Sequence, residues 1–309
     1  MNEKIISASR RTDIPAFYTP WLINRIRAGF CVYPNPLYPS KSYRVSLQKH
    51  DVLGIVFWTR HAAPLIPYLP ELDKAGFAYY FQYTVVGYPR ELDLRSPPLE
   101  TAMKTFCELS QKIGADKVIW RYDPIILNHE LTVAWHQENF RRIADGIAHA
   151  TQRIVVSVVD PYAKTRRRIG TTDDGVFYNP DDYTDLLRWM VAEASARKLR
   201  VQSCAEASMN IAGLTAGGCV DASLLYPIGR RGNPIKVRLH KQREGCLCHQ
   251  SIDVGVNDSC GFGCQYCYAT KSHDKAMATL KSHNPDWTCI TGDVHIDAPD
   301  EGPRQQLLF

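Results

Sequence analysis

The 309-residue sequence has no long apolar run, no internal repeat and no low-complexity tract. Its longest apolar run covers residues 52–58, whereas a helix that crosses a bilayer needs roughly 20 apolar residues. The first residues, MNEKIISASRR, contain no apolar signal core. We therefore expect a cytoplasmic protein without a membrane segment. A composition that is 45% hydrophobic and 22% charged also excludes disorder, collagen and a coiled coil.

A strong excess of one charge is lacking as well. Lys and Arg number 37 against 32 Asp and Glu, which gives a net charge of +5. This balance permits a polyanionic partner but does not require one. Composition alone therefore identifies no partner.

Cysteine, by contrast, is abundant, with ten residues in a chain that shows no secretion signal. Thiols stay reduced in the cytoplasm, where clustered cysteines more often bind metal than form disulfides. Three of them, Cys31, Cys107 and Cys289, are isolated. The other seven lie within one C-terminal stretch: Cys204, Cys219, Cys246, Cys248, Cys260, Cys264 and Cys267. We expect the chemistry of the protein in this stretch.

The first 206 residues alternate between apolar, β-rich runs and helical stretches, which is typical of β/α units around a parallel sheet. The expected strands are residues 5–9, 52–59, 79–85, 117–121, 154–159 and 199–204. The expected helices are residues 15–28, 100–113, 132–148 and 183–198. No G-x-G-x-x-G follows the first strand to favour a dinucleotide-binding, doubly wound sheet. We predict an α/β fold with a full or partial TIM-like β/α barrel.

The chain divides into three parts by its composition. Residues 1–206 form the predicted barrel core. Residues 207–283 are rich in cysteine and punctuated by Gly and Pro, and we expect them to bind a metal cluster and complete the barrel. Residues 284–309, which include three prolines, are predicted to form an irregular tail.

Polar side chains occur where several expected strands end, which is where β/α folds place their active sites. The candidates for contact with substrate or cofactor are Arg10, Arg11, Asp13, Gln82, Arg121, Asp123, Asp160 and Glu206. A structural alternative is that Asp13, Asp123 and Asp160 only cap helices or turns. Asp123 and Asp160 precede prolines, which is a common turn signal.

Three of the late cysteines, Cys260, Cys264 and Cys267, form the motif C-x3-C-x2-C. Three thiolates on one short loop can bind three irons of a 4Fe-4S cluster, because thiolate is the preferred ligand of such clusters. The fourth iron is then open to a small molecule. Gly261 and Gly263 allow the backbone angles needed to wrap closely around the cluster.

This motif, with Tyr266 as the aromatic residue before the last cysteine, resembles the signature of the radical S-adenosylmethionine (radical SAM) superfamily. The wider string C-x-x-G-C-x-Y-C-Y-A looks like the spore photoproduct lyase-like branch of that superfamily. Over the whole chain, SRRTDIP at 9–15, FWT at 57–59 and the late cysteines resemble a bacterial domain-of-unknown-function family with a radical SAM-like cysteine cluster.

The resemblance implies a cofactor and a reaction. Cys260, Cys264 and Cys267 would bind the 4Fe-4S cluster, and S-adenosylmethionine would bind its open iron. Reductive cleavage would give methionine and a 5'-deoxyadenosyl radical, which abstracts hydrogen from a substrate. Such chemistry implies a reducing electron donor such as flavodoxin or ferredoxin. The resemblance does not define the substrate or the reaction class (lyase, transferase or oxidoreductase).

One departure from the superfamily concerns chain order. The cluster loop usually follows the first strand of a partial β/α barrel, but only 42 residues follow Cys267 here. The barrel must therefore precede the loop. We hypothesise a circularly permuted radical SAM core, in which residues 251–256 form the strand before the loop, residues 269–282 form the helix after it, and the N-terminal strand lies next to them in space.

Other interpretations of the cysteines remain open. A structural zinc site could use Cys264 and Cys267 with Cys246 and Cys248, near His249, but it does not explain Cys260. A thioredoxin-like redox pair would need only Cys264 and Cys267.

A second site for zinc or an auxiliary iron-sulfur cluster could use Cys204, Cys219, Cys246 and Cys248. Alternatively, Cys204 is a small buried residue of the core. A further alternative is that Cys204 or Cys219 donates hydrogen to a radical.

Two segments suggest nucleic acid as a partner. Lys164-Thr-Arg166-Arg167-Arg168 follows an expected strand and could grip phosphate, although a solvated basic loop is the alternative. Arg230 and Arg231 add to the positive charge. The last residues, Gln305-Gln-Leu-Leu-Phe309, resemble peptides that dock bacterial DNA-processing proteins on the sliding clamp, and packing onto the chain's own domain is the alternative.

The favoured prediction is a radical SAM-like enzyme that acts on an undefined substrate, with DNA or a nucleotide as the leading class. Tyr266 and Tyr268, beside the cysteines, are candidate cofactor contacts together with Gly261 and Gly263. The alternative is a nucleic-acid-binding protein whose zinc or iron-sulfur site performs no radical chemistry.

Overall fold

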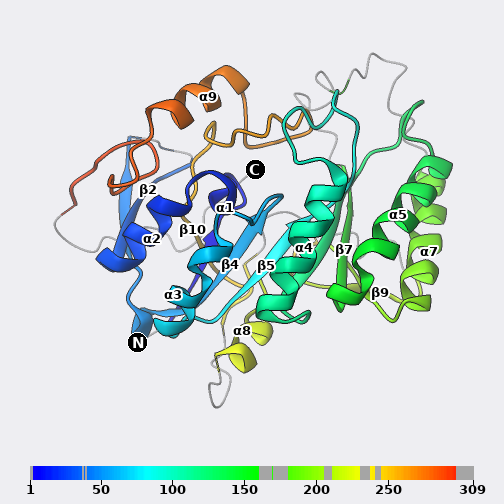
Figure 1. Ribbon diagram of the computed structural model, residues 1–309, viewed down its shortest axis with the longest axis horizontal. Coiled ribbons are helices and arrows are strands. Elements are labelled where there is room, and N and C mark those ends of the chain that lie inside the picture. The colour runs from blue at the N-terminus through cyan, green and yellow to red at the C-terminus, as the bar shows by residue number, and fades with distance from the viewer. Residues whose placement is uncertain are drawn as a thin grey trace. The chain divides into compact units, whose positions relative to one another are not determined.

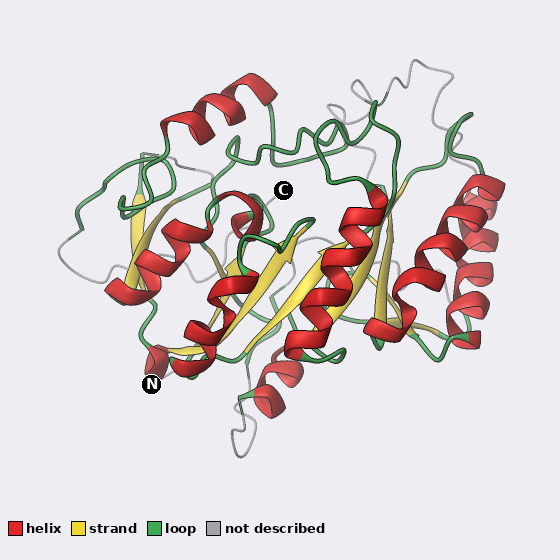
Figure 2. Cartoon of the chain, viewed as in Figure 1, coloured by secondary structure: helices red, strands yellow, loops and turns green. Residues whose placement is uncertain are grey.

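The computed structural model describes residues 3–36, 38, 40–159, 169, 180–204, 211–229, 237–240 and 245–296. These residues form a mixed α/β structure (Figure 1), with the strands and helices distinguished in Figure 2. Eight strands form a sheet in the order β10-β1-β4-β5-β6-β7-β8-β9, and β2 and β3 form a separate ribbon. The predicted α/β class is confirmed. Within the described strands β10 and β9 end this order, so closure into a full barrel is not shown.

The helices and strands have the following bounds. The large sheet contains β1 (Lys4–Ala8), β4 (Val52–Thr59), β5 (Tyr79–Thr84), β6 (Val118–Ile125), β7 (Arg153–Val158), β8 (Arg200–Ser203), β9 (Leu214–Ala216) and β10 (Ile252–Asp253). The ribbon contains β2 (Phe30–Pro34) and β3 (Ser42–Ser46). The helices are α1 (Ile14–Phe17), α2 (Thr19–Ala28), α3 (Leu69–Lys74), α4 (Leu99–Ile113), α5 (Val133–Ile147), α7 (Pro180–Ala196), α8 (Ala222–Ile228) and α9 (His273–Ser282). None of the helices in the described ranges has both the length and the apolar character needed to cross a membrane.

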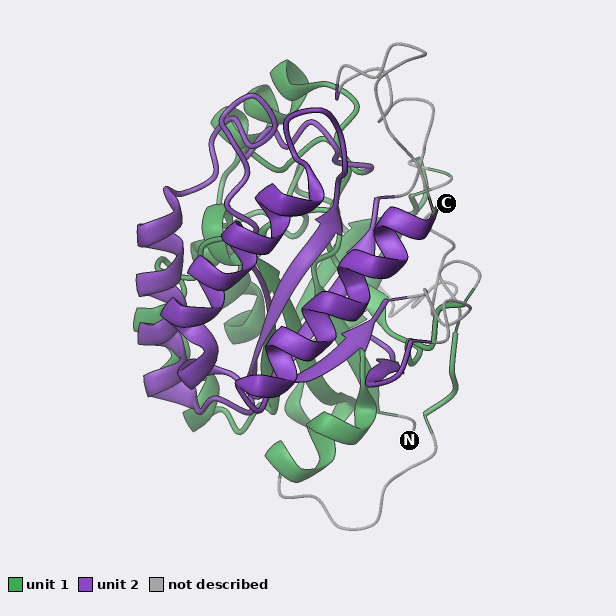
Figure 3. Ribbon diagram, turned by 90° about the vertical axis from the view of Figure 1, so that its right-hand side faces the viewer, with its two compact units in different colours: residues 1–81, 220–261, 269–309 green, residues 82–219, 262–268 purple. Residues whose placement is uncertain are grey.

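The chain forms two compact units, which Figure 3 colours separately. Unit 1 comprises Met1–Phe81, Val220–Gly261 and Ala269–Phe309, and unit 2 comprises Gln82–Cys219 and Phe262–Tyr268. Neither unit is one continuous segment. The boundaries predicted from composition, at residues 206 and 283, stay a prediction.

In unit 1, β1 pairs in parallel with β10 on one side and with β4 on the other. Ile6 lies opposite Ile252, and Ser7 lies opposite Asp253. The strand predicted within residues 251–256 therefore lies beside the N-terminal strand, as the permutation hypothesis requires. The helix predicted after the cysteine loop is present as α9, which Ser272 caps through the N–H of Lys275. The core of this unit includes Phe57 and Phe81, whose stacked rings have centroids 4.8 Å apart.

In unit 2, β6, β7, β8 and β9 pair in parallel and in chain order. Right-handed crossovers place the helices that connect such strands on one face of the sheet. The order of these strands lacks the reversal that a doubly wound sheet has at its switch point, and the predicted barrel stays a prediction. The core of the unit includes Trp120 and Phe140, which stack with ring centroids 5.0 Å apart. Phe140 also meets Trp189 of α7, so α5 packs against α7.

Local sequence signals account for most helix ends. Gly29 ends α2 with a φ of 78°, and Thr132 caps α5 by accepting from the N–H of Trp135. The single helix predicted over residues 15–28 is wrong, because the chain breaks at Tyr18 into α1 and α2. Pro20 explains the break, since proline is accepted in the first turn of a helix but disrupts its interior.

Candidate functional site

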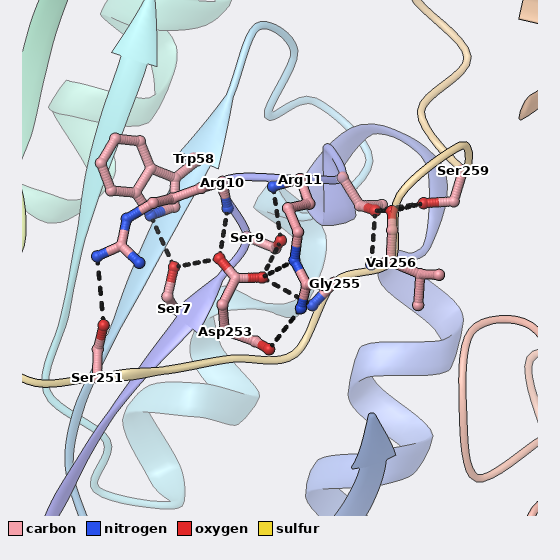
Figure 4. A network of polar contacts seen from close by, with 11 residues as sticks. Ser7, Ser9, Arg10, Arg11, Trp58, Ser251, Asp253, Gly255, Val256 and Ser259 are labelled. Atoms are coloured by element: carbon pink, nitrogen blue, oxygen red, sulfur yellow. Dashed lines mark hydrogen bonds and ion pairs between the residues drawn. The ribbon is translucent and has the colours of Figure 1, made fainter. Parts of the chain in front are cut away.

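The polar network of unit 1 is centred on Asp253, whose side chain is only 9% exposed (Figure 4). Its Oδ1 accepts hydrogen bonds from Ser9 Oγ at 2.6 Å and from Arg11 Nε at 3.3 Å. Its Oδ2 accepts from Ser7 Oγ at 3.0 Å and from the backbone N–H of Arg10 at 2.8 Å. The network thus joins the segment that follows β1 to the end of β10. It brings together two predicted site residues, Arg10 and Arg11.

The two arginines balance the charge of Asp253. Burial alone raises the pKa of this carboxyl, but the positive charges of Arg11 and Arg10 and the hydrogen bond from Ser9 outweigh burial and hold the pKa below its usual value. Arg11 is itself buried and also donates to the carbonyl oxygen of Asp253 at 3.1 Å. Arg10 is half-buried, with its guanidinium over the ring of Trp58 at 5.4 Å from the centroid. Arg10 is thus the more accessible of the two cations.

The predicted site residue Asp13 acts as a helix cap, as the structural alternative proposes. Its carboxylate accepts from the N–H of Ala16 at 3.0 Å, from Thr59 Oγ1 at 2.8 Å and from the N–H of Arg60 at 2.7 Å. Burial raises the pKa of Asp13 to about 7, although these hydrogen bonds oppose the rise. Asp13 therefore joins the start of α1 to the end of β4.

The segment between β10 and the cysteine loop is fixed by the N-terminal segment. Thr12 Oγ1 donates to the carbonyl oxygen of Val256 at 2.7 Å and accepts from its N–H at 3.1 Å. Thr12 Oγ1 also contacts Ser259 Oγ. Tyr18 donates its hydroxyl to the carbonyl oxygen of Ser259 at 2.6 Å. The residue that precedes Cys260 is therefore held from two sides.

The two ends of the cysteine loop are joined at Asp258. Its N–H donates to the carbonyl oxygen of Ala269 at 3.1 Å, which closes the loop at its base. Its carboxylate accepts from the backbone N–H groups of Lys271 and Ser272, and Lys275 Nζ lies 3.7 Å from Oδ2. One buried aspartate therefore ties the start of the loop to the first turn of α9.

The three cysteines of the motif lie within this closed loop. Cys260, Cys264 and Cys267 are all half-buried thiols. The N–H of Cys267 donates to the carbonyl oxygen of Cys264 at 3.1 Å, so the last two cysteines share a tight turn. All three residues belong to a loop whose two ends are joined by a hydrogen bond between Asp258 and Ala269.

The glycines of the loop have two different roles. Gly263 has a φ of 72°, a left-handed conformation that favours glycine. Gly261 is packed closely, because a Cβ at this position would lie 3.0 Å from the ring of Phe17 and 3.1 Å from Leu280. Gly263 therefore shapes the turn of the loop, and Gly261 allows the loop to pack closely against Phe17 and Leu280 of unit 1.

The predicted aromatic contact Tyr266 is anchored within unit 2. Its hydroxyl donates to Asp93 Oδ1 at 2.6 Å, and its ring meets that of Tyr88 edge to face, with centroids 5.7 Å apart. Asp93 also forms a backbone bridge with Cys264. Tyr266 thus holds the middle of the cysteine loop, while Tyr268 is half-buried.

Three cysteines on one short segment are the kind of donor set that binds a 4Fe-4S cluster. Cys260, Cys264 and Cys267 are half-buried residues of this loop. Within the described ranges, no three His, Cys, Asp or Glu side chains are grouped as ligands of one metal ion. A 4Fe-4S cluster spreads its thiolates over separate irons, so they stay farther apart than the ligands of a single tetrahedral ion. The cluster and the zinc alternative both stay predictions.

A second polar network, in unit 2, involves residues of β5, β6 and β7. The buried guanidinium of Arg121 donates to Cys219 Sγ at 3.0 Å and to Gln82 Oε1 at 3.3 Å, and it pairs with Asp123. Asp123 also accepts from Ser157 Oγ. Burial opposes the charge of Arg121, but Asp123 and Cys219 outweigh it and keep its pKa above the usual value. Three predicted site residues, Gln82, Arg121 and Asp123, therefore form one network.

The other four late cysteines occur as two pairs. Cys219 Sγ lies 3.2 Å from Cys204 Sγ in unit 2. Cys246 and Cys248 are buried in unit 1, where Cys248 Sγ accepts from the N–H of Val220 at 3.5 Å. A second metal site formed by all four stays a prediction.

Several predicted residues lie outside the described part of the chain. These are Asp160, Glu206, the basic segment 164–168, Arg230, Arg231 and the C-terminal residues 305–309. Their proposed roles stay predictions.

Asp253 and Asp258 are central to these contacts but are not among the site residues predicted from the sequence. A signal for Asp253 was present, because an acidic residue inside an otherwise apolar strand needs a buried partner. Its partners, however, lie more than 240 residues away in the sequence. The signal for Asp258 is its place two residues before Cys260, the first cysteine of the motif.

Comparison with known proteins identifies a family. The profile of the family described as "Domain of unknown function (DUF1848)" matches residues 5–269, from β1 to the end of the cysteine loop. No curated protein matches the sequence.

Proposed function

The chain belongs to the DUF1848 family, a domain of unknown function, and we propose that it is a radical SAM-like enzyme. Cys260, Cys264 and Cys267 would hold a 4Fe-4S cluster, with S-adenosylmethionine at the remaining iron. When bound, the cluster would supply the electron for reductive cleavage of S-adenosylmethionine to methionine and a 5'-deoxyadenosyl radical. A flavodoxin or ferredoxin would deliver that electron, and the radical would take hydrogen from a substrate of the DNA or nucleotide class.

The observation that carries this proposal is the parallel pairing of β10 with β1. Because of it, the cysteine loop follows a strand of the sheet and precedes a helix, α9, although it comes late in the chain. The radical SAM superfamily, which the motif resembles, has its cluster loop after the first barrel strand. A circularly permuted chain would keep the order of strand, cysteine loop and helix that the superfamily has, although this unit would come late in the sequence.

The residues around the loop would keep the three thiols in place. Asp258 closes the base of the loop, and Thr12 holds the backbone of Val256 just before it. Tyr266 fixes the middle of the loop through Asp93. Fixed ligands retain a cluster better than mobile ones, because little conformational entropy is lost on binding.

Arg10 is the candidate for contact with an anionic group of the cofactor or substrate. It is half-buried at the carboxyl end of β1, and its stacking on Trp58 orients the guanidinium. Guanidinium groups bind carboxylate and phosphate through two parallel hydrogen bonds. Arg11 serves a different purpose, since it is committed to Asp253 and holds β10 beside β1.

Metal analysis and EPR spectroscopy test the proposal. After anaerobic reconstitution, the wild-type chain is expected to hold about four irons and about four acid-labile sulfides. Addition of S-adenosylmethionine should change the EPR spectrum of the reduced cluster, because the molecule binds an iron that lacks a cysteine ligand. Cys260→Ala, Cys264→Ala and Cys267→Ala should each lower the iron content, whereas Cys107→Ala, outside the loop, should not.

Two results would contradict the proposal. A chain that binds zinc and no labile sulfide would favour the nucleic-acid-binding alternative. A cluster whose EPR spectrum is unchanged by S-adenosylmethionine would indicate an electron carrier instead.

A further inference from the structure

Cys204 and Cys219 form a close pair of thiols outside the cysteine loop. Cys204 directly follows β8, and Cys219 follows β9, the parallel neighbour of β8. Ser203 of β8 and Ala216 of β9 are partners in that ladder, so the two strands run side by side toward the two cysteines. The two sulfur atoms are 3.2 Å apart. Closing this distance to a disulfide bond requires a movement of only about 1 Å.

A cation lies against one member of the pair. Arg121 Nη1 donates to Cys219 Sγ at 3.0 Å, and the guanidinium is buried. A guanidinium next to a cysteine stabilises the thiolate, which is the nucleophilic form. The backbone of Cys219 is also held, because Gln82 Nε2 donates to its carbonyl oxygen at 2.8 Å and Gln202 Nε2 donates to that of Gly218 at 3.2 Å.

The two cysteine residues differ in exposure. Cys204 is half-buried, whereas Cys219 is 2% exposed. An external reagent can therefore reach Cys204 more readily than Cys219. This asymmetry is typical of redox-active cysteine pairs, in which one thiol meets the reagent and the second completes the reaction.

We propose that Cys204 and Cys219 are a redox-active dithiol that is oxidised by low-molecular-weight disulfides. The Cys204 thiolate attacks one sulfur of the disulfide RSSR, forms a mixed disulfide and expels RS⁻. The Cys219 thiolate then attacks the Cys204 sulfur, forms the Cys204–Cys219 bond and expels the second RS⁻. The two thiol protons pass to the two RS⁻ groups, so the protein loses two electrons and RSSR becomes two RSH. This proposal does not depend on the radical SAM function.

The test uses the full chain, reduced and then exposed anaerobically to glutathione disulfide, followed by trypsin digestion and mass spectrometry. Both cysteines lie on one tryptic peptide, residues 201–230, and the late cysteines from Cys246 to Cys267 lie on another, residues 244–271. An internal disulfide thus appears as a loss of two hydrogens from the first peptide. The wild type is expected to show this loss, and dithiothreitol should reverse it.

Variants separate the two roles. In Cys219→Ser, the reaction should stop at the first step, so that one glutathione accumulates on Cys204. In Cys204→Ser, Cys219 should stay unmodified because it is buried. Arg121→Gln should slow formation of the internal disulfide about tenfold, and Arg121→Lys, which keeps the charge, should restore most of the rate. Thermal unfolding of each variant checks that it is folded.

The chain contains a matched control pair. Cys31 and Cys289 are both buried and close enough to interact electrostatically, and burial raises the pKa of the Cys31 thiol. This pair should stay reduced under the same conditions. The proposal would be overturned by a wild-type peptide 201–230 that stays reduced, by a main cross-link between the two tryptic peptides, or by equal glutathione adducts on Cys204 and Cys219 in the two serine variants. Zinc bound to Cys204 and Cys219 that prevents their oxidation would also overturn it.

Discussion

Replacement of Asp253 by asparagine should destabilise the protein strongly, because this carboxylate joins β10 to β1. Its two oxygens accept from Ser7, Ser9, Arg10 and Arg11. An asparagine side chain has one oxygen, so its NH₂ group would replace one of the two carboxylate oxygens and would face the donors that this oxygen now binds. It also leaves the buried Arg11 without its counter-ion. Removal of one partner of a buried ion pair costs roughly 3–5 kcal/mol, and because asparagine keeps some hydrogen bonds, we expect a loss of about 3 kcal/mol at pH 7.

Urea unfolding followed by circular dichroism measures this loss. The matched control is Glu71→Gln, which breaks the exposed pair between Arg27 and Glu71 in the same unit, and should cost at most about 1 kcal/mol. The pKa of Asp253 is lowered in the folded state. Its contribution to stability is therefore complete above its unfolded pKa of about 4 and disappears as the pH falls through the folded value. The difference between wild type and Asp253→Asn should shrink in that acidic range. A variant no less stable than Glu71→Gln, or a difference that grows in acid, would refute this reasoning.

Three further predictions concern the cysteine loop and a buried histidine. Gly263→Ala, at a φ of 72°, should cost about 1 kcal/mol in urea unfolding and lower iron retention, whereas Gly292→Ala, whose Cβ would meet nothing within 4 Å, should do neither. Asp258→Ala removes the carboxylate that holds Lys271 and Ser272, so hydrogen exchange should quicken at these amides while the amides of β6 keep their protection. Burial lowers the pKa of His136 to about 4 in the folded state. The contribution of neutral His136 to stability is therefore complete above the unfolded pKa of about 6.5, and the free energy of unfolding should fall by about 3 kcal/mol as the pH drops to 4. In urea titrations, His136→Gln should lose most of this pH dependence, and a variant with the same pH dependence as the wild type would contradict the lowered pKa of His136.

The sequence was sufficient for those parts of the fold that local patterns determine. Apolar runs located β1, β4, β5, β6, β7 and β8, and glycines located the ends of α2 and α4. The strands β2, β3 and β9 were not predicted. The placement of residues 251–256 beside the first strand was a hypothesis drawn from the resemblance to the radical SAM superfamily, and β10 pairs Ile252 and Asp253 of this segment with β1. The short helix α8 was not predicted, since it contains Pro227 and lies among glycines and prolines. Barrel closure depends on strand pairing that local patterns do not encode.

The candidate site was less predictable because its contacts join distant parts of the chain. Arg10 and Arg11 were identified, but their partner Asp253 was not. For Asp13, sequence alone left capping and catalysis open, and the structure shows that it caps α1. The pairing of Cys204 with Cys219 depends on the neighbouring positions of β8 and β9. Residue type therefore indicated chemistry, but tertiary contacts decided which groups act together.

Detection of 5'-deoxyadenosine tests the central claim most directly. The reconstituted chain would be incubated anaerobically with S-adenosylmethionine and dithionite, and the products separated by chromatography. We expect 5'-deoxyadenosine and methionine from the wild type and from Cys107→Ala, and none from a variant with alanine at Cys260, Cys264 and Cys267. Equal product from the triple variant, or none from a wild type that holds a complete cluster, would contradict the proposed function.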